Sequence, residues 1–211
     1  MTCPLCLNKT IDFYHQDKFR DYWRCSICQL VFVKPEYHLN ATQEKKVYDL
    51  HQNNSMDSGY RKFLNKLIIP FLEKLTQKML GLDFGSGPGP TISVMLGEQG
   101  IRVENYDIFY NDKPELLDQT YDFITSTEVI EHLFNPNKVI SMFTTMLKPN
   151  GLLGIMTKRV INKEKFNNWH YKNDLTHVCF YSDETFDFIA KQWGYKLELV
   201  DTDAVILTKH C

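Results

Sequence analysis

The sequence contains no apolar run long enough to cross a membrane. Its longest apolar runs, such as LIIPFL, fall far short of the roughly 18 residues that a spanning helix needs. The N-terminus lacks the basic start and the following apolar stretch of a secretory signal. We therefore expect a protein of the cytoplasm with no membrane partner.

A surplus of positive charge is also missing. The chain of 211 residues holds 24 Lys and Arg against 26 Asp and Glu, a net charge of −2, and residues 1–57 hold seven of each class. Nonspecific nucleic-acid binding requires clustered positive charge, so there is no strong signal for a nucleic-acid partner. With 43% hydrophobic residues the chain can form a core, and its length suits one domain plus a small appendage.

Cysteine is scarce, and four of the six cysteines fall in two Cys-x-x-Cys pairs near the N-terminus: Cys3, Cys6, Cys25 and Cys28. Two such pairs separated by eighteen residues are typical of a four-thiolate zinc site. Disulfides are disfavoured without a secretory signal, and a redox thiol pair requires only one Cys-x-x-Cys. We predict a zinc-ribbon-like module over residues 1–35. Four thiolates close the coordination sphere, so we expect the metal to be structural and not catalytic.

Beyond this module the pattern changes twice. Residues 36–57 are polar and weakly periodic, which is typical of a connector. Residues 60–78 carry apolar side chains at helical spacing, interrupted by Pro70. A strand, a glycine turn, a helix and a second strand then follow in order, which is a βαβ unit. The last two apolar runs are joined too closely for a helical crossover, so we expect them to pair antiparallel. Residues 58–211 form the predicted α/β domain.

A glycine-rich turn follows the first strand of this domain. Gly85, Gly87 and Gly89 come directly after the strand that carries Asp83, and Asp107 ends the next predicted strand about twenty residues on. An acid at that place can bind the ribose hydroxyls of an adenosine ligand.

The turn does not suit a nucleotide phosphate. Its glycine spacing differs from Gly-x-Gly-x-x-Gly, prolines stand at positions 88 and 90, and no Gly-Lys-Ser/Thr follows as in a Walker loop. Asp83 would also repel phosphates, whereas it suits a ligand that carries an ammonium group and no phosphate. S-adenosylmethionine has this chemistry.

The motifs LDFGSGPG, NYDIFY, YDFITSTEVIEHL and LKPNGLLGIMT, with the terminal strand pair, resemble the successive motifs of class I S-adenosylmethionine-dependent methyltransferases over residues 59–211. The cysteine module, DLHQNN and WHYKNDLTHVCFYS are similar to a bacterial group of these proteins with an N-terminal zinc-binding segment. The resemblance implies a Rossmann-like, doubly wound sheet of seven mostly parallel strands with an antiparallel last strand. It also implies a set of cofactor-binding residues: Asp83, Phe84, Gly85, Ser86, Gly87, Asp107, Ile108 and Thr127.

The third-strand region of the family is very short in this chain, where it reads NDKPELLDQT. Asp112 and Asp118 are therefore both open as the acid that contacts adenine.

Methyl transfer is an in-line displacement from a sulfonium, so a base is needed only where the acceptor must lose a proton. The candidate bases are His132, on the turn after the fourth strand, and His177, in a polar and aromatic segment. Glu128 is the third catalytic candidate and could face the cofactor or the acceptor. A structural role stays open for each of them. His132 could be a helix-start histidine bonded to the backbone, His177 could be a structural histidine, and Glu128 could cap the following helix.

The leading hypothesis is S-adenosylmethionine-dependent methyl transfer to a small-molecule acceptor, with structural zinc in the N-terminal module. One alternative is an RNA or protein methyltransferase that uses the zinc module to bind its substrate. Another is a binding protein of the same fold without activity. The sequence identifies neither the acceptor, nor the methylated atom, nor the oligomeric state.

Overall fold

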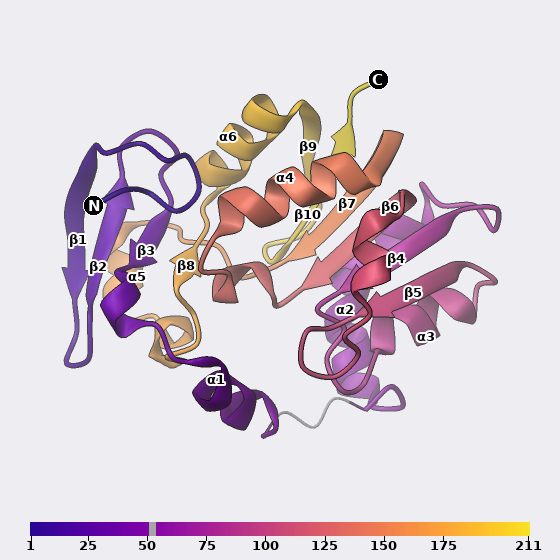
Figure 1. Cartoon of the computed structure of the whole chain (residues 1–211), viewed down its shortest axis with the longest axis horizontal. Coiled ribbons are helices and arrows are strands. Elements are labelled where there is room, and N and C mark those ends of the chain that lie inside the picture. The colour runs from indigo at the N-terminus through magenta and orange to yellow at the C-terminus, as the bar shows by residue number, and fades with distance from the viewer. Residues whose placement is uncertain (51–53) are drawn as a thin grey trace.

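A computed structural model describes residues 1–50 and 54–211 and contains two sheets that lie side by side (Figure 1). The smaller sheet forms the left side of the molecule in this view and the larger sheet the right. The DLHQNN motif of residues 49–54 lies partly outside the described residues, so its similarity to the zinc-binding group has no structural counterpart here.

The small sheet joins the N-terminal segment to a distant part of the chain. Its order is β1-β2-β3-β8, and every pairing is antiparallel. Three strands come from the cysteine segment, whereas the fourth comes from a segment about 145 residues further along the chain: Ile11–Gln16 (β1), Asp21–Cys25 (β2), Val31–Val33 (β3) and Cys179–Phe180 (β8). The proposed boundaries at residues 35 and 57 stay a prediction, and this pairing ties the two parts of the chain together.

Short helices connect the two sheets. A 3-10 turn at Pro35–Tyr37 (η1) precedes the helix Ala41–Tyr48 (α1), which Asn40 caps by accepting a hydrogen bond from the backbone N–H of Gln43. The next helix, Ser58–Leu72 (α2), is capped by Asp57 and contains Pro70 two residues before its end. The helix therefore does not break at Pro70: it includes this residue and ends at Leu72, and the missing N–H of Pro70 costs one hydrogen bond in its last turn.

Among residues 1–50 and 54–211, the large sheet has six strands in the order β5-β4-β6-β7-β10-β9. The β5, β4, β6 and β7 strands are parallel, and β10 runs antiparallel to both its neighbours, which confirms the expected mostly parallel sheet with an antiparallel last strand. The strands are Leu80–Phe84 (β4), Arg102–Tyr106 (β5), Tyr121–Thr127 (β6), Leu147–Met156 (β7), Tyr195–Leu199 (β9) and Ala204–Lys209 (β10).

The expectation of seven strands is corrected to six. Between β5 and β6 the chain forms the 3-10 helix Pro114–Asp118 (η2) where the family's third strand was expected. The segment is too short for a further strand with its crossover, and Pro114 at the first turn favours the helix. The β5 strand is therefore an edge of the sheet.

Helices cover both faces of the large sheet. On one face α2 and Thr91–Gly97 (α3) pack against alternate strand residues such as Leu152 and Met156. On the other, Pro136–Met146 (α4) and Asp183–Trp193 (α6) pack against Leu153 and Ile155, in a core that also includes the N-terminal segment. The remaining short elements are Ile130–His132 (η3), Lys163–Asn167 (α5) and His170–Asn173 (η4). Among residues 1–50 and 54–211, no helix is both long and apolar enough to cross a membrane.

Candidate functional site

The glycine turn and Asp107 meet at the edge where parallel strands end. The backbone N–H groups of Gly85 and Ser86 donate to the Tyr106 carbonyl at 2.8 and 3.1 Å. The N–H of Gly87 donates to Asp107 Oδ2 at 2.8 Å, which joins the turn after β4 to the acid after β5. Adjacent parallel strands end at the same edge of a sheet, so the structure brings the two predicted cofactor elements together.

The turn depends on glycine for its shape. Gly85 and Gly87 have φ values of +78° and +64°, a region that other residues rarely adopt. A Cβ at position 85 would lie 2.4 Å from Cγ2 of Val129, so a side chain there would collide with the next loop. The hydroxyl oxygen of Ser86 is buried with no hydrogen-bond partner in the described part of the chain. A buried hydroxyl without a partner on this turn suits a polar ligand.

Asp83 lies in β4 beneath this turn. Its carboxylate is buried and accepts a hydrogen bond from Thr125 Oγ1 at 2.8 Å. Burial raises the pKa of Asp83 to about 7. A buried carboxylate with a raised pKa is stabilised as the anion by a neighbouring cation, which is what the ammonium group of a ligand would supply.

The other predicted cofactor residues lie along the same edge. Ile108 is 65% exposed directly after Asp107, where an apolar side chain can cover a ligand ring. Thr127 ends β6. The Phe84 ring packs inward, with its centroid 5.3 Å from that of Tyr106, so its side chain belongs to the core. Asp112 and Asp118, the two open candidates for the adenine contact, are both exposed on the segment around η2.

A second cluster of polar side chains surrounds Tyr171. Glu128, with φ +54°, follows β6, and Glu131 lies one turn further on in η3. The Tyr171 hydroxyl lies 3.3 Å from Glu128 Oε2 and also donates to Glu131 Oε1. Burial raises the pKa of Glu128 to about 7, and it raises the pKa of the fully buried Glu131 well above its ordinary value.

The two predicted histidines meet beside this pair of acids. The rings of His132 and His177 lie edge to face with centroids 4.7 Å apart. His132 Nδ1 lies 3.3 Å from the Thr176 carbonyl, and His177 Nδ1 lies 2.7 Å from the Tyr171 carbonyl. Since a carbonyl oxygen only accepts, each Nδ1 carries the proton and each ring presents Nε2 on its other side. The three catalytic candidates thus lie in one cluster with Glu131.

The connector helix α1 reaches both parts of this region. The Tyr48 ring lies 5.3 Å from the His132 ring and 5.6 Å from the Phe109 ring, measured between centroids. The Tyr110 hydroxyl donates to Asp49 Oδ1 at 2.8 Å. The end of α1 therefore contacts the loop after Asp107 and the turn that carries His132.

Sequence reasoning missed Glu131 and Arg20. Glu131 stands three residues after Glu128, a spacing that brings side chains together on a turn and could have indicated the pair. Arg20 is only 3% exposed, and its guanidinium donates to three carbonyls of the segment that carries His177: Lys172 at 2.8 Å, Asp174 at 2.9 Å and Leu175 at 3.1 Å. No local pattern could indicate contacts between residues so far apart in sequence.

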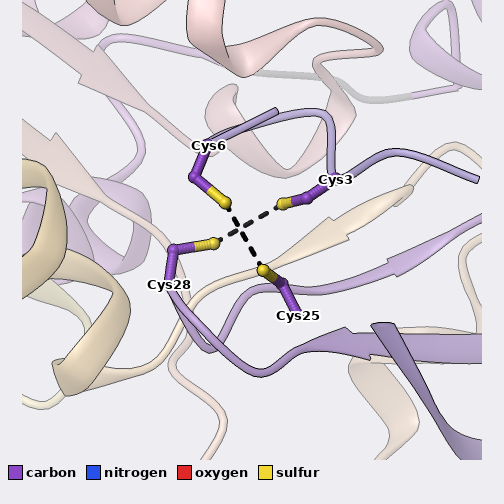
Figure 2. Close-up of side chains that lie close together, drawn as sticks. All are labelled: Cys3, Cys6, Cys25 and Cys28. Carbon is purple, nitrogen blue, oxygen red and sulfur yellow. Dashed lines mark hydrogen bonds between the residues drawn. The ribbon is translucent and has the colours of Figure 1, made fainter. Parts of the chain in front are cut away.

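The four predicted metal ligands converge on one point (Figure 2). The sulfur atoms of Cys3 and Cys28 lie 3.5 Å apart, those of Cys6 and Cys25 lie 3.4 Å apart, and all four lie within 4.8 Å of one another. These distances exclude disulfides, whose sulfurs lie about 2.05 Å apart. They suit four thiolates around a tetrahedral ion with bonds of about 2.3 Å.

The two cysteine turns have the same backbone shape. The N–H of Leu7 donates to the Cys3 carbonyl, and the N–H of Gln29 donates to the Cys25 carbonyl, both at 3.0 Å. Leu7 and Gln29 have left-handed φ values of +62° and +61°. Each Cys-x-x-Cys pair therefore lies on an equivalent tight turn. Two such turns are what the cysteine spacing predicts for a four-thiolate site.

Two solved structures share this fold. The magnesium protoporphyrin IX methyltransferase from Synechocystis PCC 6803, solved with bound SAH, aligns with a TM-score of 0.55 and 15% identity over 81% of this chain and 95% of that chain. The PH0226 protein from Pyrococcus horikoshii OT3 aligns with a TM-score of 0.53 and 17% identity over 78% and 98%. The fold is that of the class I methyltransferases.

The family follows from the sequence match. Residues 56–200, more than half of the chain, match the family model described as Methyltransferase domain, and the chain belongs to this family. The ubiquinone biosynthesis O-methyltransferase from Photobacterium profundum is 35% identical over 71 residues, 34% of this chain and 30% of that protein. Its namesake from Colwellia psychrerythraea is 30% identical over 86 residues, 41% and 35%. The chain spans about a third of the length of these curated relatives.

Proposed function

We propose that this protein transfers the methyl group of S-adenosylmethionine to a small-molecule acceptor. The observation that carries the proposal is the hydrogen bond between the Gly87 N–H and Asp107. It joins a glycine turn that does not suit a phosphate to an acid that stands where a ribose-binding acid is expected. The family match and the likeness to methyltransferase structures support it. When bound, the cofactor supplies an electrophilic methyl group on its sulfonium.

The residues of the turn have distinct roles in this proposal. Gly85 and Gly87 allow the backbone to approach the cofactor, and Asp107, whose carboxylate binds the Gly87 N–H, accepts from the ribose hydroxyls. Asp83 attracts the methionine ammonium from beneath the turn. Ile108 covers the adenine, and Thr127 borders the sulfonium. The protein mainly orients the cofactor and excludes water, which is what an in-line displacement needs.

The acceptor is proposed to bind beside the Tyr171 cluster, with an oxygen as the methylated atom. The relatives from Photobacterium and Colwellia are named as O-methyltransferases, and a hydroxyl acceptor must lose a proton during methylation. Glu128 has a pKa raised by burial to about 7, a value that suits proton transfer near neutral pH. His177 and His132 lie beside it and are the other candidate bases.

The four cysteines are proposed to hold a structural zinc ion. Their donor set leaves no position for a reacting water, so the ion would stabilise the N-terminal module. This module directly holds the segment that carries Tyr171 and His177. The β3 strand pairs with β8 after this segment, and Arg20 binds three carbonyls just before β8. We therefore propose that zinc acts on the site through the position of this segment.

A turnover assay tests the proposal. Purified protein is incubated with a metabolite extract and methyl-labelled S-adenosylmethionine, and mass spectrometry follows the label and the release of S-adenosylhomocysteine. We expect a labelled small molecule, and we expect Asp107→Ala to abolish it, whereas Asp187→Ala on the exposed face of α6 leaves it unchanged. Cofactor binding without labelling of any extract component would favour the inactive binding protein instead.

A further inference from the structure

The cluster beside Tyr171 contains a second group of side chains that could bind a metal ion, one glutamate and two histidines. One carboxylate oxygen of Glu131 and one nitrogen each of His132 and His177 lie within 4.8 Å of one another. Ligand atoms that share one cation at bonds of about 2.1 Å lie roughly 3–4 Å apart, so these three atoms lie near the spacing of a shared site. Two imidazoles and one carboxylate form a donor set typical of divalent transition metals.

Two buried carboxylate oxygens point independently to a cation. Glu131 is 0% exposed, and its Oε2 has no hydrogen-bond partner among residues 1–50 and 54–211. Oε1 of Glu128 is likewise buried without a partner in the same described ranges. The Tyr171 hydroxyl reaches only the other oxygen of each acid. Burying two carboxylates side by side is costly unless positive charge accompanies them, and a divalent cation supplies it.

The histidines are held as metal-binding histidines usually are. The Nδ1 of each ring donates to a backbone carbonyl, of Thr176 for His132 and of Tyr171 for His177. Such bonds fix the ring orientation and the tautomer, so that Nε2 is the nitrogen with a lone pair. His177 Nε2 also lies 3.9 Å from Asp174 Oδ2, which places a third carboxylate next to the cluster.

We propose that Glu131, His132 and His177 bind one divalent first-row transition metal ion, separate from the four-thiolate site. Nitrogen and oxygen ligands suit manganese, iron or cobalt, whereas the four cysteines select zinc. Three protein ligands leave coordination positions open. In a step that rests on the proposed function, an acceptor hydroxyl oxygen occupies one of them, which lowers the pKa of that hydroxyl beside Glu128.

Manganese binding to the zinc-loaded full chain tests this proposal. Mn²⁺ is titrated in the absence of cofactor and acceptor, and the decrease of the free-ion signal is followed by electron paramagnetic resonance. We expect one saturable equivalent, with zinc content unchanged by plasma mass spectrometry. His177→Gln and Glu131→Gln should each weaken Mn²⁺ binding by about 100-fold or more. The matched control is His170→Gln, an exposed histidine outside the cluster, which should bind Mn²⁺ as the wild type does.

The outcomes separate this inference from the proposed function. Absence of saturable Mn²⁺ binding to the wild type, or equal binding to wild type and His177→Gln, would overturn the metal site. Calorimetry with S-adenosylmethionine on the same samples reports the cofactor site independently. Cofactor binding without Mn²⁺ binding rejects the metal site alone, and Mn²⁺ binding without cofactor binding rejects the proposed function alone. Equal urea midpoints of wild type and His177→Gln show that the variant is folded.

Discussion

Replacing Arg20 with glutamine should loosen the segment that carries His177. The guanidinium donates to the carbonyls of Lys172, Asp174 and Leu175, and its Nε donates to Tyr22 at 3.0 Å. Glutamine is too short and has too few donors to reach all three carbonyls, so buried acceptors would be left without partners.

The expected magnitude follows from these bonds. A hydrogen bond from a charged donor contributes about 1.5–3 kcal/mol net, and bonds that share one side chain do not add fully. We expect Arg20→Gln to lower the free energy of unfolding by about 3–5 kcal/mol, a large part of the roughly 5–15 kcal/mol typical of a domain. The urea midpoint of the zinc-loaded chain should fall by about 1–2 M.

A neighbouring arginine on the same hairpin provides the control. Arg24 is exposed and lies over the Tyr14 ring at 5.7 Å, so Arg24→Gln should cost less than about 1 kcal/mol. Hydrogen exchange should show faster exchange across residues 170–177 in Arg20→Gln only. Equal midpoints for the two variants, with unchanged protection of this segment, would refute the reasoning.

Three further predictions concern the cofactor turn and the cysteine module. Gly85→Ala should weaken S-adenosylmethionine binding at least tenfold in calorimetry, because a Cβ there would lie 2.4 Å from a valine side chain. The control Gly97→Ala, which has open space around it, should bind the cofactor normally. Equal affinities of the two variants would contradict the turn geometry. Burial raises the pKa of Asp83 to about 7, so its carboxyl is about 10% ionised at pH 6 and about 90% ionised at pH 8. The affinity for S-adenosylmethionine, measured by calorimetry, should therefore rise by roughly ninefold over this range in the wild type. The affinity of Asp83→Asn should not change with pH. The same raised pKa means that the folded state holds the proton more tightly than the unfolded one, so Asp83 lowers the stability of the free protein as pH rises from about 4 to 7. Cys25→Ser should release the metal and expose residues 1–35 to protease, unlike substitution of the exposed Cys211 by serine, and undiminished protease resistance after proven metal loss would remove the zinc assignment.

The order of strands and helices in the large sheet could be predicted because it depends on local periodicity. The glycine turn and Asp107 were also predictable, since their spacing in one βαβ unit places them at the same edge. The missing third strand was harder, because a short segment can form either a strand or a 3-10 turn, and Pro114 decides for the turn.

Long-range contacts set the limit of the sequence reasoning. The pairing of β3 with β8 joins strands of three and two residues, too short to produce a readable alternation. Glu131 was not predicted as buried, because glutamate is rarely fully buried and its surroundings come from Tyr171 forty residues later. Arg20 reads as an ordinary surface arginine until its three carbonyl partners are known.

The central claim is that the turn after β4 and Asp107 bind S-adenosylmethionine. Isothermal titration calorimetry of S-adenosylmethionine into cofactor-stripped, zinc-loaded protein tests it most directly. The account predicts one binding site per chain that Asp107→Ala abolishes and Asp187→Ala retains. Absence of measurable binding to the folded wild type, or binding of equal strength to Asp107→Ala, would contradict it.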